Sequence, residues 1–496
     1  MAATFSPACK KNQDSVLPNI VYILVDDMGY GDPKIYNPDA KTSTPNIDRL
    51  ASQGMLFTDA HSPSAVCTPT RYGILTGRYC WRTRLTWGVL GGDSPSLIDK
   101  DRTTIASFLK EIGYTTGVVG KWHLGVDWIK WNTEPKNVIP STENPYFALS
   151  KKINYSLSPT SGTLDRGFDY SFIFPGTLDA PPYCFLENDK LVTVPDSLTE
   201  GKNLESGAKG AFWRKGPIAK DFDFMEVTPI VTRKAITFLE KVSNSEKPFF
   251  LYLAYPSPHT PWMPSSEFIG TSGAGEYGDF VNMVDSEVEK VLQTLANLEL
   301  DENTLLFFAS DNGPYWWPVD IEKFGHKAAG DLRGMKGSPF EGGHRIPFIA
   351  RWPGKIKAGS LCSEPVSLTS LLATCAELLG KELLDNEGED SHSILPLLLN
   401  KPEDYQEPEA LIQHSARGQF VVRKGDWKLI LTHEESGQPA REGDQHFLFN
   451  LKNDPSEEMD LYEQNPQKVK ELNAILEGFK ASGRSRNIRE EISKEQ

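Results

Sequence analysis

Asn19-Ile20-Val21-Tyr22-Ile23-Leu24-Val25 is a short apolar run, rich in β-branched residues, in which polar and apolar side chains do not alternate. A strand that a parallel sheet buries on both faces has this pattern, whereas a strand with one face in water alternates. Residues 114–119, 249–254 and 304–309 are runs of the same kind. The sequence therefore predicts an α/β fold built on a large, mostly parallel central sheet.

Helices are expected between these runs, flanking the sheet. Residues 44–54 contain a capping threonine, a proline at the first helical position and a terminal glycine, and a second helix over 104–112 is stopped by Gly113. From Phe280 to Leu295 the apolar residues recur every three or four positions. This spacing is typical of an amphipathic helix that packs its apolar stripe on a sheet.

Acids, bases and amides follow four of the predicted strands. In chain order they are Asp26 and Asp27, Lys121 and His123, His259, and Asp311 and Asn312. Taken alone, each of these four groups could equally belong to an ordinary turn or a solvated loop. Because open α/β sheets bind their ligands at the carboxyl ends of the strands, four such endings together predict one functional site.

The chemistry of these side chains indicates a metal site. Asp26, Asp27, Asp311 and Asn312 offer only hard oxygen ligands. Oxygen ligands suit Ca²⁺ or Mg²⁺ and do not make a thiolate zinc site. We therefore expect a hard divalent cation at this edge of the sheet.

A second stretch, 65–78, brings a cysteine, a helix start and two arginines close together. We expect Thr68 to cap a helix whose first residue is Pro69, which places Cys67 just before the helix N-terminus. That end of a helix favours anions and ionised nucleophiles, and Arg71 adds a fixed cation one turn later. Taken alone, the pattern also fits a buried free cysteine before an ordinary helix.

The run Cys67-Thr68-Pro69-Thr70-Arg71, followed by Leu75-Thr76-Gly77-Arg78, resembles the signature of the formylglycine-dependent sulfatases of the arylsulfatase A type, which share an alkaline phosphatase-like fold. Thr70 stands where the commoner pattern has serine or alanine. With the strand-end motifs in the family's order, the resemblance covers residues 19–380.

This resemblance implies a cofactor and a set of site residues. A transient maturation enzyme would oxidise Cys67 to formylglycine, and calcium, or magnesium as the alternative, would be held by Asp26, Asp27, Cys67, Asp311 and Asn312. The implied catalytic residues are Cys67, Arg71, Lys121, His123, His259 and Lys336. The segment 341–345 resembles a family segment that we interpret as structural support.

The resemblance also implies a mechanism. One hydroxyl of the hydrated formylglycine attacks sulfur and the alcohol leaves, and the second hydroxyl, losing its proton to His123, then expels sulfate. The metal, Arg71, Lys121 and Lys336 neutralise the sulfuryl oxygens. His259, with Lys336, donates a proton to the leaving alcohol.

Composition bounds the remaining possibilities. The 496 residues are 39 % hydrophobic, enough for one large domain and a smaller one, and the formal net charge is −15. This charge gives no general basic face for nucleic acid or anionic lipid. The sequence holds no apolar run of about 18 residues, so we expect no membrane span. The six cysteines include no C-x-x-C pair and no disulfide framework.

The chain is expected to divide into three parts. Residues 1–16 are polar and are expected to be flexible, and 17–400 should form the catalytic α/β domain. In 401–496 the runs 418–423, 427–431 and 445–451 read as short strands, and 466–482 as a closing helix. A small antiparallel C-terminal subdomain is therefore predicted.

Residues 126–226 show no regular spacing of apolar residues, so they are expected to form loops, and they contain several aromatic residues. Aromatic rings can stack on sugars, although packing explains each one separately as well. The candidates are Trp128, Trp131, Tyr183, Trp213, Trp316 and Trp317.

The resulting functional prediction is an exo-acting sulfatase of sulfated saccharides, with galactose or N-acetylgalactosamine sulfates expected first. A net charge of −15 would repel a long polyanion lying in an open groove, which favours attack at a chain end. The alternatives are a phosphodiesterase or phosphonate monoester hydrolase, a sulfatase of lipids or steroids, and a catalytically silent polysaccharide-binding protein. Family analogy favours a location outside the cytoplasm, and the oligomeric state stays open.

Overall fold

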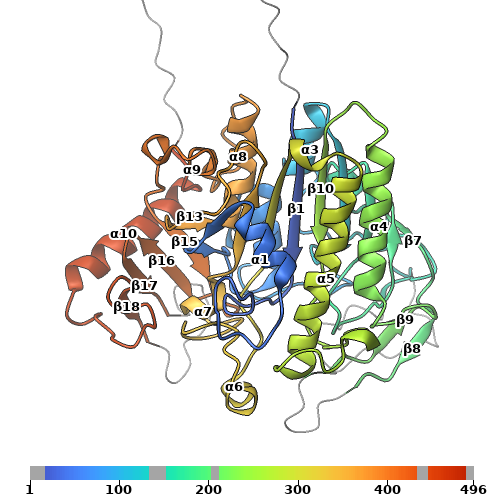
Figure 1. Cartoon of the computed structure of the whole chain (residues 1–496), viewed down its shortest axis with the longest axis horizontal. Coiled ribbons are helices and arrows are strands. Elements are labelled where there is room, and N and C mark those ends of the chain that lie inside the picture. Colours follow the sequence, from blue (N-terminus) through green and yellow to red (C-terminus); the bar gives the residue numbers. More distant parts are fainter. Residues whose placement is uncertain (1–16, 133–151, 203–209, 211, 433–444, 488–496) are drawn as a thin grey trace, which may run out of the picture.

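The computed structural model describes residues 17–132, 152–202, 210, 212–432 and 445–487 (Figure 1). Within these residues a ten-stranded sheet runs through the molecule in the order β13-β2-β12-β11-β1-β10-β4-β5-β6-β7. The predictions for residues 1–16 and for the end of the tail, 488–496, lie outside the described residues.

Five neighbouring strands at the centre of this sheet are parallel, and they are β11 (Thr304–Ser310), β1 (Asn19–Val25), β10 (Phe249–Ala254), β4 (Thr115–Lys121) and β5 (Tyr170–Phe174). Every residue of β1 is buried, and Val21 pairs with Leu251 on one side and Leu306 on the other. The run without alternation is thus a strand covered on both faces, and the predicted α/β fold is confirmed.

The outer strands make the sheet mixed. On one side β12 (Phe348–Arg351) is antiparallel to β11, β2 (Met55–Phe57) is antiparallel to β12, and β13 (Ser360–Cys362) is parallel to β2. On the other side β6 (Leu186–Glu187) and β7 (Lys190–Leu191) continue antiparallel from β5. Two small sheets pair β3 (Ala60–His61) with β14 (Val366–Ser367) and β8 (Ser197–Thr199) with β9 (Gly216–Ile218).

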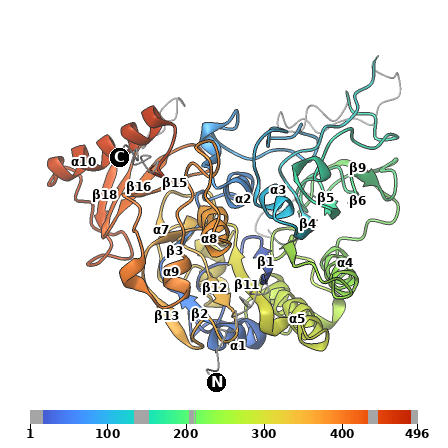
Figure 2. The same cartoon turned by 90° about the horizontal axis from the view of Figure 1, so that it is seen from above.

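Helices cover both faces of the central sheet (Figures 1 and 2). One layer contains α1 (Pro45–Ser52), α4 (Val227–Val242) and α5 (Gly275–Asn297), and the other α2 (Cys67–Thr76), α3 (Ile105–Glu111) and α8 (Leu371–Leu378). The predicted stripe of α5 is buried, except that Leu292 is only partly so. Three short helices lie in the connections: α6 (Pro318–Phe324), α7 (Glu341–His344) and α9 (Leu395–Leu398).

The start of α1 is not capped as the sequence predicts. Thr44 makes no side-chain cap, because its hydroxyl accepts a hydrogen bond from the Lys34 backbone N–H instead. The free N–H groups of Asn46 and Ile47 donate to the carboxylate of Asp285, which lies on α5. A residue about 240 positions away therefore performs the capping role that local sequence assigns to threonine.

The C-terminal part forms a separate antiparallel sheet in the order β15 (Leu411–His414), β16 (Phe420–Lys424), β17 (Trp427–Ile430) and β18 (Phe447–Asn450). Helix α10 (Pro466–Ser482) packs on this sheet through a buried apolar cluster that includes Val422, Leu429, Leu472 and Leu476. The predicted small antiparallel subdomain is confirmed, and it lies at one side of the molecule in Figure 1. No helix in the described part of the chain is long and apolar enough to cross a membrane.

Candidate active site

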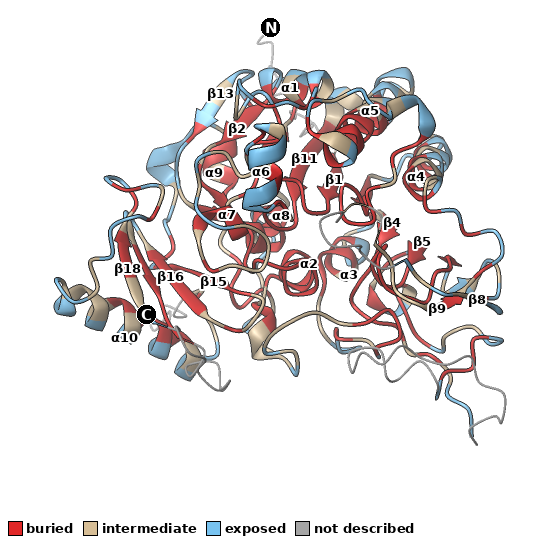
Figure 3. Cartoon of the chain, turned by 90° about the horizontal axis from the view of Figure 1, so that it is seen from below, coloured by how far each residue is buried: buried red, intermediate tan, exposed pale blue. Residues whose placement is uncertain are grey.

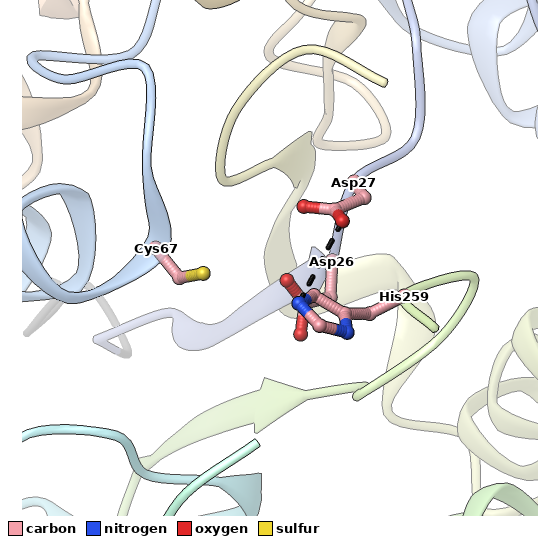
Figure 4. Close-up of side chains that lie close together, drawn as sticks. All are labelled: Asp26, Asp27, Cys67 and His259. Carbon is pink, nitrogen blue, oxygen red and sulfur yellow. Dashed lines mark ion pairs between the residues drawn. The ribbon is translucent and has the colours of Figure 1, made fainter. Parts of the chain in front are cut away.

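Parallel strands bring the candidate residues to one edge of the sheet. Asp26 and Asp27 follow β1, Lys121 is the last residue of β4, and Asp311 directly follows β11. These segments are buried (Figure 3). Figure 4 shows Asp26, Asp27 and His259 together, with Cys67 facing them from the start of α2.

Three carboxylates in this cluster each pair with a cation. Lys121 Nζ donates to Asp26 Oδ2, Arg71 Nη2 donates to Asp311 Oδ2 at 2.8 Å, and Lys336 Nζ donates to Asp27 Oδ2 at 2.8 Å. Removing one member of a buried pair leaves an uncompensated charge, which costs several kcal/mol. Arg71 Nη2 also lies 3.7 Å from Asp26 Oδ2, which links two of these pairs into one charged centre.

The pKa values follow from this arrangement. Burial alone would raise the pKa of Asp26, but Lys121, His259 and Arg71 hold it below its usual value. Burial, and next the charge of Asp26, raise the pKa of Asp311 although Arg71 opposes the change. The Arg71 pKa is raised because Asp311 and Asp26 outweigh its burial.

Two buried oxygens in the cluster have no hydrogen-bond partner among the described residues: Asp26 Oδ1 and Asn312 Oδ1. The Asn312 amide is oriented, since its Nδ2 donates to Asp27 Oδ1 at 2.7 Å. Ligand atoms of Asp26, Asp27, Cys67 and His259 all lie within 4.8 Å of one another. A buried oxygen without a partner is costly, and oxygen donors suit a hard cation, so the residues fit the metal that the sequence predicts.

Cys67 lies within its helix and not just before it, which corrects the prediction. The N-cap is Val66, whose carbonyl accepts the first intrahelical hydrogen bond from Thr70 at 3.4 Å. Thr68 is no cap, because its hydroxyl donates to the His123 carbonyl at 2.9 Å and accepts from Leu90 N–H at 3.2 Å. Cys67 is 2 % exposed and still lies in the first turn, where the helix dipole favours negative charge.

His123 is held as a neutral imidazole with one nitrogen free. Its Nε2 lies 2.7 Å from the Leu90 carbonyl, which only accepts, so Nε2 carries the hydrogen. Nδ1 is buried and has no hydrogen-bond partner among the described residues. Burial, followed by the charge of Lys121, lowers the pKa of His123 well below its usual value. The ring therefore presents an unprotonated nitrogen.

His259 has the opposite character. Its Nδ1 donates to the Thr260 carbonyl at 2.6 Å, and its Nε2 lies 3.8 Å from Asp27 Oδ2 (Figure 4). Burial and Lys336 oppose its charge, but Asp27 and Asp26 raise the pKa of His259 to about 9. One histidine of the cluster can accept a proton and the other can donate one.

A fifth strand end, after β5, also reaches the site and is not among the four that the sequence predicts. The Thr177 hydroxyl lies 3.3 Å from Lys121 Nζ and 3.3 Å from His259 Nε2. Asp179 follows two residues later and pairs with Arg214. The signal was available: polar residues after the apolar run 170–174 follow the same rule as the other four endings.

The segment 341–345 belongs to a second buried polar cluster. His61, Glu341 and His344 have the spacing of a metal site, but Lys428 Nζ lies 2.9 Å from Glu341 and 3.2 Å from His344 Nε2. Lys428, from β17, and Arg345, which lies 3.4 Å from Glu341, therefore supply positive charge to this cluster. The predicted supporting role agrees with this arrangement, which ties α7 to the C-terminal sheet.

Most of the candidate sugar-stacking rings pack inside the protein. Tyr183 lies against Phe224 with ring centroids 5.2 Å apart, and Trp213 lies 4.8 Å from the same ring. Trp128 and Trp316 are buried and donate to backbone carbonyls. The exposed members of the set are Trp131 and Trp317, with 41 % and 39 % of their surface accessible.

Comparisons with known proteins show which family the chain resembles along its length. The family model described as Sulfatase matches residues 18–381. The chain is 36 % identical to the N-acetylgalactosamine-6-O-sulfatase of Bacteroides thetaiotaomicron, with 94 % of each chain covered. It is 31 % identical to arylsulfatase A of Bos taurus over 94 % of this chain and 89 % of the relative.

A solved structure is also similar throughout. It comes from Bacteroides thetaiotaomicron and is described under the metabolism of multiple glycosaminoglycans. Its TM-score is 0.79 at 34 % sequence identity, and the match covers 94 % of this chain and 100 % of that one.

Proposed function

The chain belongs to the sulfatase family, as a sulfuric ester hydrolase of the arylsulfatase A type, and from this premise we propose that it removes sulfate from saccharides. The observation that carries the proposal is the juxtaposition of Cys67, at the first turn of α2, with the charged centre around Asp26 and Asp27. A thiol-bearing residue, unpaired oxygens and fixed cations at one sheet edge suit the cleavage of an anionic ester.

We propose that a divalent cation, calcium first and magnesium as the alternative, is held by Asp26, Asp27, Asp311, Asn312 and the modified Cys67. When bound, such an ion polarises the oxygens of a sulfate group as a Lewis acid. Asp26 Oδ1 and Asn312 Oδ1 support the proposal, because neither has a hydrogen-bond partner among the described residues. Each oxygen could bind a cation through a lone pair.

Metal analysis tests this assignment. Stoichiometric calcium or magnesium is expected in the purified protein and is expected to be absent from Asp311→Ala. The matched control is Asp331→Ala, which removes an exposed carboxylate that pairs only at the surface with Lys327. Equal metal content in the protein and in Asp311→Ala would reject the site.

Cys67 is proposed to be converted to formylglycine by a maturation enzyme that acts on the chain transiently. Its hydrate would supply both the oxygen that attacks sulfur and the second hydroxyl through which sulfate is released. Arg71, Lys121 and Lys336 are the cations that pair with the aspartates of this centre. Because a bound cation competes for the aspartates, it would leave these side chains freer to hold a sulfate.

The two histidines take complementary roles in this proposal. His123 Nδ1 accepts a proton, which its lowered pKa and free nitrogen support. His259 Nε2 donates a proton to the departing alcohol, which its raised pKa supports, with Lys336 beside the same carboxylate. A base and an acid are thereby available without any change of fold.

The proposed substrate is a saccharide that carries its sulfate at or near a chain end. The similarity to an N-acetylgalactosamine-6-O-sulfatase along nearly the whole chain supports galactose or N-acetylgalactosamine sulfates as first choice. The net charge of −15 supports terminal attack, because a long polyanion would be repelled from the surface.

Sulfate release from a matched panel tests the substrate class. The panel contains mono-, di- and oligosaccharides with defined sulfates, a sulfolipid, a steroid sulfate and a synthetic aryl sulfate. We expect the terminal sugar sulfates to give the highest kcat/KM. Preference for the lipid or steroid, or equal cleavage of internal and terminal sugars, would overturn the proposal.

The superfamily alternative is tested in the same assay with an aryl phosphate, a phosphodiester and a phosphonate monoester. Faster hydrolysis of a phosphorus ester than of any sulfate ester would replace the sulfatase proposal. A catalytically silent saccharide-binding protein is the remaining alternative. It would carry an unmodified Cys67, and it would bind the sulfated sugars without releasing sulfate.

We also propose a location outside the cytoplasm, by analogy with the family. Fractionation of cells that produce the native full-length protein, with sulfatase activity assayed in each fraction, tests it.

A further inference from the structure

Asp179 is a buried acid that the proposed chemistry does not use. It is 9 % exposed and lies two residues after Thr177, whose hydroxyl is 3.3 Å from both Lys121 Nζ and His259 Nε2. The Asp179 carboxylate also lies close enough to His259 and Lys336 to interact with their charges, which places it beside the same site. Burial alone would raise the pKa of Asp179, but His259 and Arg214 lower it, so the side chain is a carboxylate at neutral pH.

The two carboxylate oxygens of Asp179 differ in their surroundings. Oδ2 accepts from Arg214 Nη1, and the Asp179 carbonyl accepts from the same Nη1 at 3.1 Å and from the Arg214 backbone N–H at 3.0 Å. Oδ1 is buried and accepts no hydrogen bond from the described residues. An ionised oxygen without a donor is costly to bury, and a ligand that brings a donor would recover that cost.

Arg214 is itself held firmly. The Tyr183 hydroxyl donates to the Arg214 carbonyl at 2.9 Å, and Tyr183 packs against Phe224, which also contacts the ring of Trp213. The carboxylate is thus oriented before any ligand binds, which is the arrangement that gives selectivity at low entropic cost. The rings of Tyr183, Trp213 and Phe224 pack on one another and support the pair.

We propose that Asp179 Oδ1 accepts a hydrogen bond from a hydroxyl of the sugar ring that carries the sulfate, with Arg214 fixing the carboxylate. This inference rests on the proposed saccharide sulfatase activity and assigns one of its specificity determinants. A carboxylate only accepts, so it selects a neutral hydroxyl. It repels a second sulfate or a carboxylate at the same ring position. An aryl sulfate has no such hydroxyl and gains nothing from Asp179.

Two variants and two substrates test the inference. Asp179→Asn keeps the shape, but Arg214 only donates and would select the amide oxygen, leaving NH₂ where the acceptor stood. Asp179→Ala removes the group. For N-acetylgalactosamine 6-sulfate we expect kcat/KM to fall by about 10- to 100-fold, the scale of one hydrogen bond to a charged acceptor. For 4-nitrophenyl sulfate the fall should be at least tenfold smaller.

Asp221→Asn is the matched control. Asp221 lies in the same loop-rich region, but it is bonded to Thr193 at the exposed surface. Its kcat/KM should match the wild type on both substrates. Circular dichroism and thermal unfolding of each variant establish that the compared proteins are folded.

A substrate cycle identifies the hydrogen bond itself. The 3-deoxy and 4-deoxy analogues of the sugar sulfate are compared in the wild type and in Asp179→Ala. One deoxy analogue should lose about 10- to 100-fold in the wild type and less than about threefold in the variant, because the partner is already absent. Equal losses in both proteins for both analogues would overturn the inference.

The remaining outcomes separate the inference from the proposed function. If Asp179→Asn lowers activity on the sugar sulfate and the aryl sulfate by the same factor, Asp179 acts through His259 and the inference is wrong although the sulfatase proposal stands. If the wild type cleaves the aryl sulfate but no saccharide, the proposed substrate class is wrong and the inference falls with it.

Discussion

Single residues in the site act through pairs of opposite charge. Lys336 contacts Asp27 while remaining 14 % exposed at its side chain, so it is the cation of the three that solvent reaches. Arg71 is fully buried between Asp26 and Asp311, and Lys121 is fully buried against Asp26. Each side chain balances an aspartate, and we propose that each also offers a positive charge to a sulfate.

Lys336→Ala is expected to lower kcat by about 10²–10³ fold, which is the effect of removing one preorganised donor from a developing negative charge. The measurement is steady-state hydrolysis of an aryl sulfate by the folded variant. Lys327→Ala is the control, since Lys327 is 57 % exposed and pairs with Asp331 on the surface. Unchanged turnover in folded Lys336→Ala would leave Lys336 without a role in the chemistry.

Cys67→Ser is expected to abolish turnover, because a serine hydroxyl cannot become the hydrated aldehyde that has two hydroxyl groups. The check combines sulfate release with mass spectrometry of the peptide that contains residue 67. The wild-type peptide should show loss of sulfur and gain of a carbonyl oxygen when a maturation enzyme is present. Wild-type turnover by the serine variant would mean that another residue is the nucleophile.

At the scale of elements, the turns after the strands depend on close backbone contacts. Gly313 follows Asn312, and its N–H donates to the Gly343 carbonyl at 2.9 Å. A Cβ on Gly313 would lie 1.9 Å from the Gly342 carbonyl oxygen. Helix α7 therefore presses against the turn that carries two of the proposed metal ligands, Asp311 and Asn312.

Gly313→Ala should destabilise the fold by about 1–3 kcal/mol, because the backbone must shift to admit the methyl group. It should also lower kcat by up to about 10² fold through displacement of Asn312. Gly478→Ala, at an open position of α10, should instead stabilise by about 0.5–1 kcal/mol. Denaturant unfolding compares the two, and equal effects would show that the contact at Gly313 is relieved without strain.

At the scale of the whole molecule, the C-terminal sheet supports the site through charge. Lys428 of β17 is fully buried and contacts Glu341 of α7 at 2.9 Å and Glu457 at 2.7 Å. Through α7 this contact reaches Gly313 and so the proposed metal ligands. The apolar cluster of the C-terminal sheet also includes Tyr79 from the large part of the chain. We therefore propose that the division near residue 400 is visible in the sequence but that the two parts do not unfold independently.

Lys428→Met should lower the free energy of unfolding by about 3–5 kcal/mol, because two buried carboxylates lose their cation while the packing volume is kept. Lys468→Met removes a partly exposed surface pair with Glu471 and should change stability by less than about 0.5 kcal/mol. Both are measured by denaturant unfolding. Equal stability of the two variants would mean that this charge contact contributes nothing to the fold.

The sequence predicted much of the central sheet and named the residues that the structure brings to its edge, while their catalytic and metal-binding roles stay predictions. The central strands were predicted correctly because a strand that is buried on both faces is apolar along its whole length. The residues that cap helices were predicted less accurately. Asp285 supplies the cap predicted at Thr44, and the Thr68 hydroxyl donates to the His123 carbonyl instead of capping α2. Local rules fail there because a distant group competes for the same hydrogen bond.

By itself the sequence determined the class of fold, the sheet edge at which polar residues gather and the family resemblance carried by the run from Cys67 to Arg71. These properties depend on residues that are close together in the chain, so residue spacing and apolar runs are enough to predict them. The tertiary structure alone decided that Lys428 balances Glu341, that the aromatic loop residues pack on one another, and that one oxygen of Asp179 finds no donor among the described residues. Each of these depends on groups that meet only after folding, because burial and charge pairing are properties of neighbours in space.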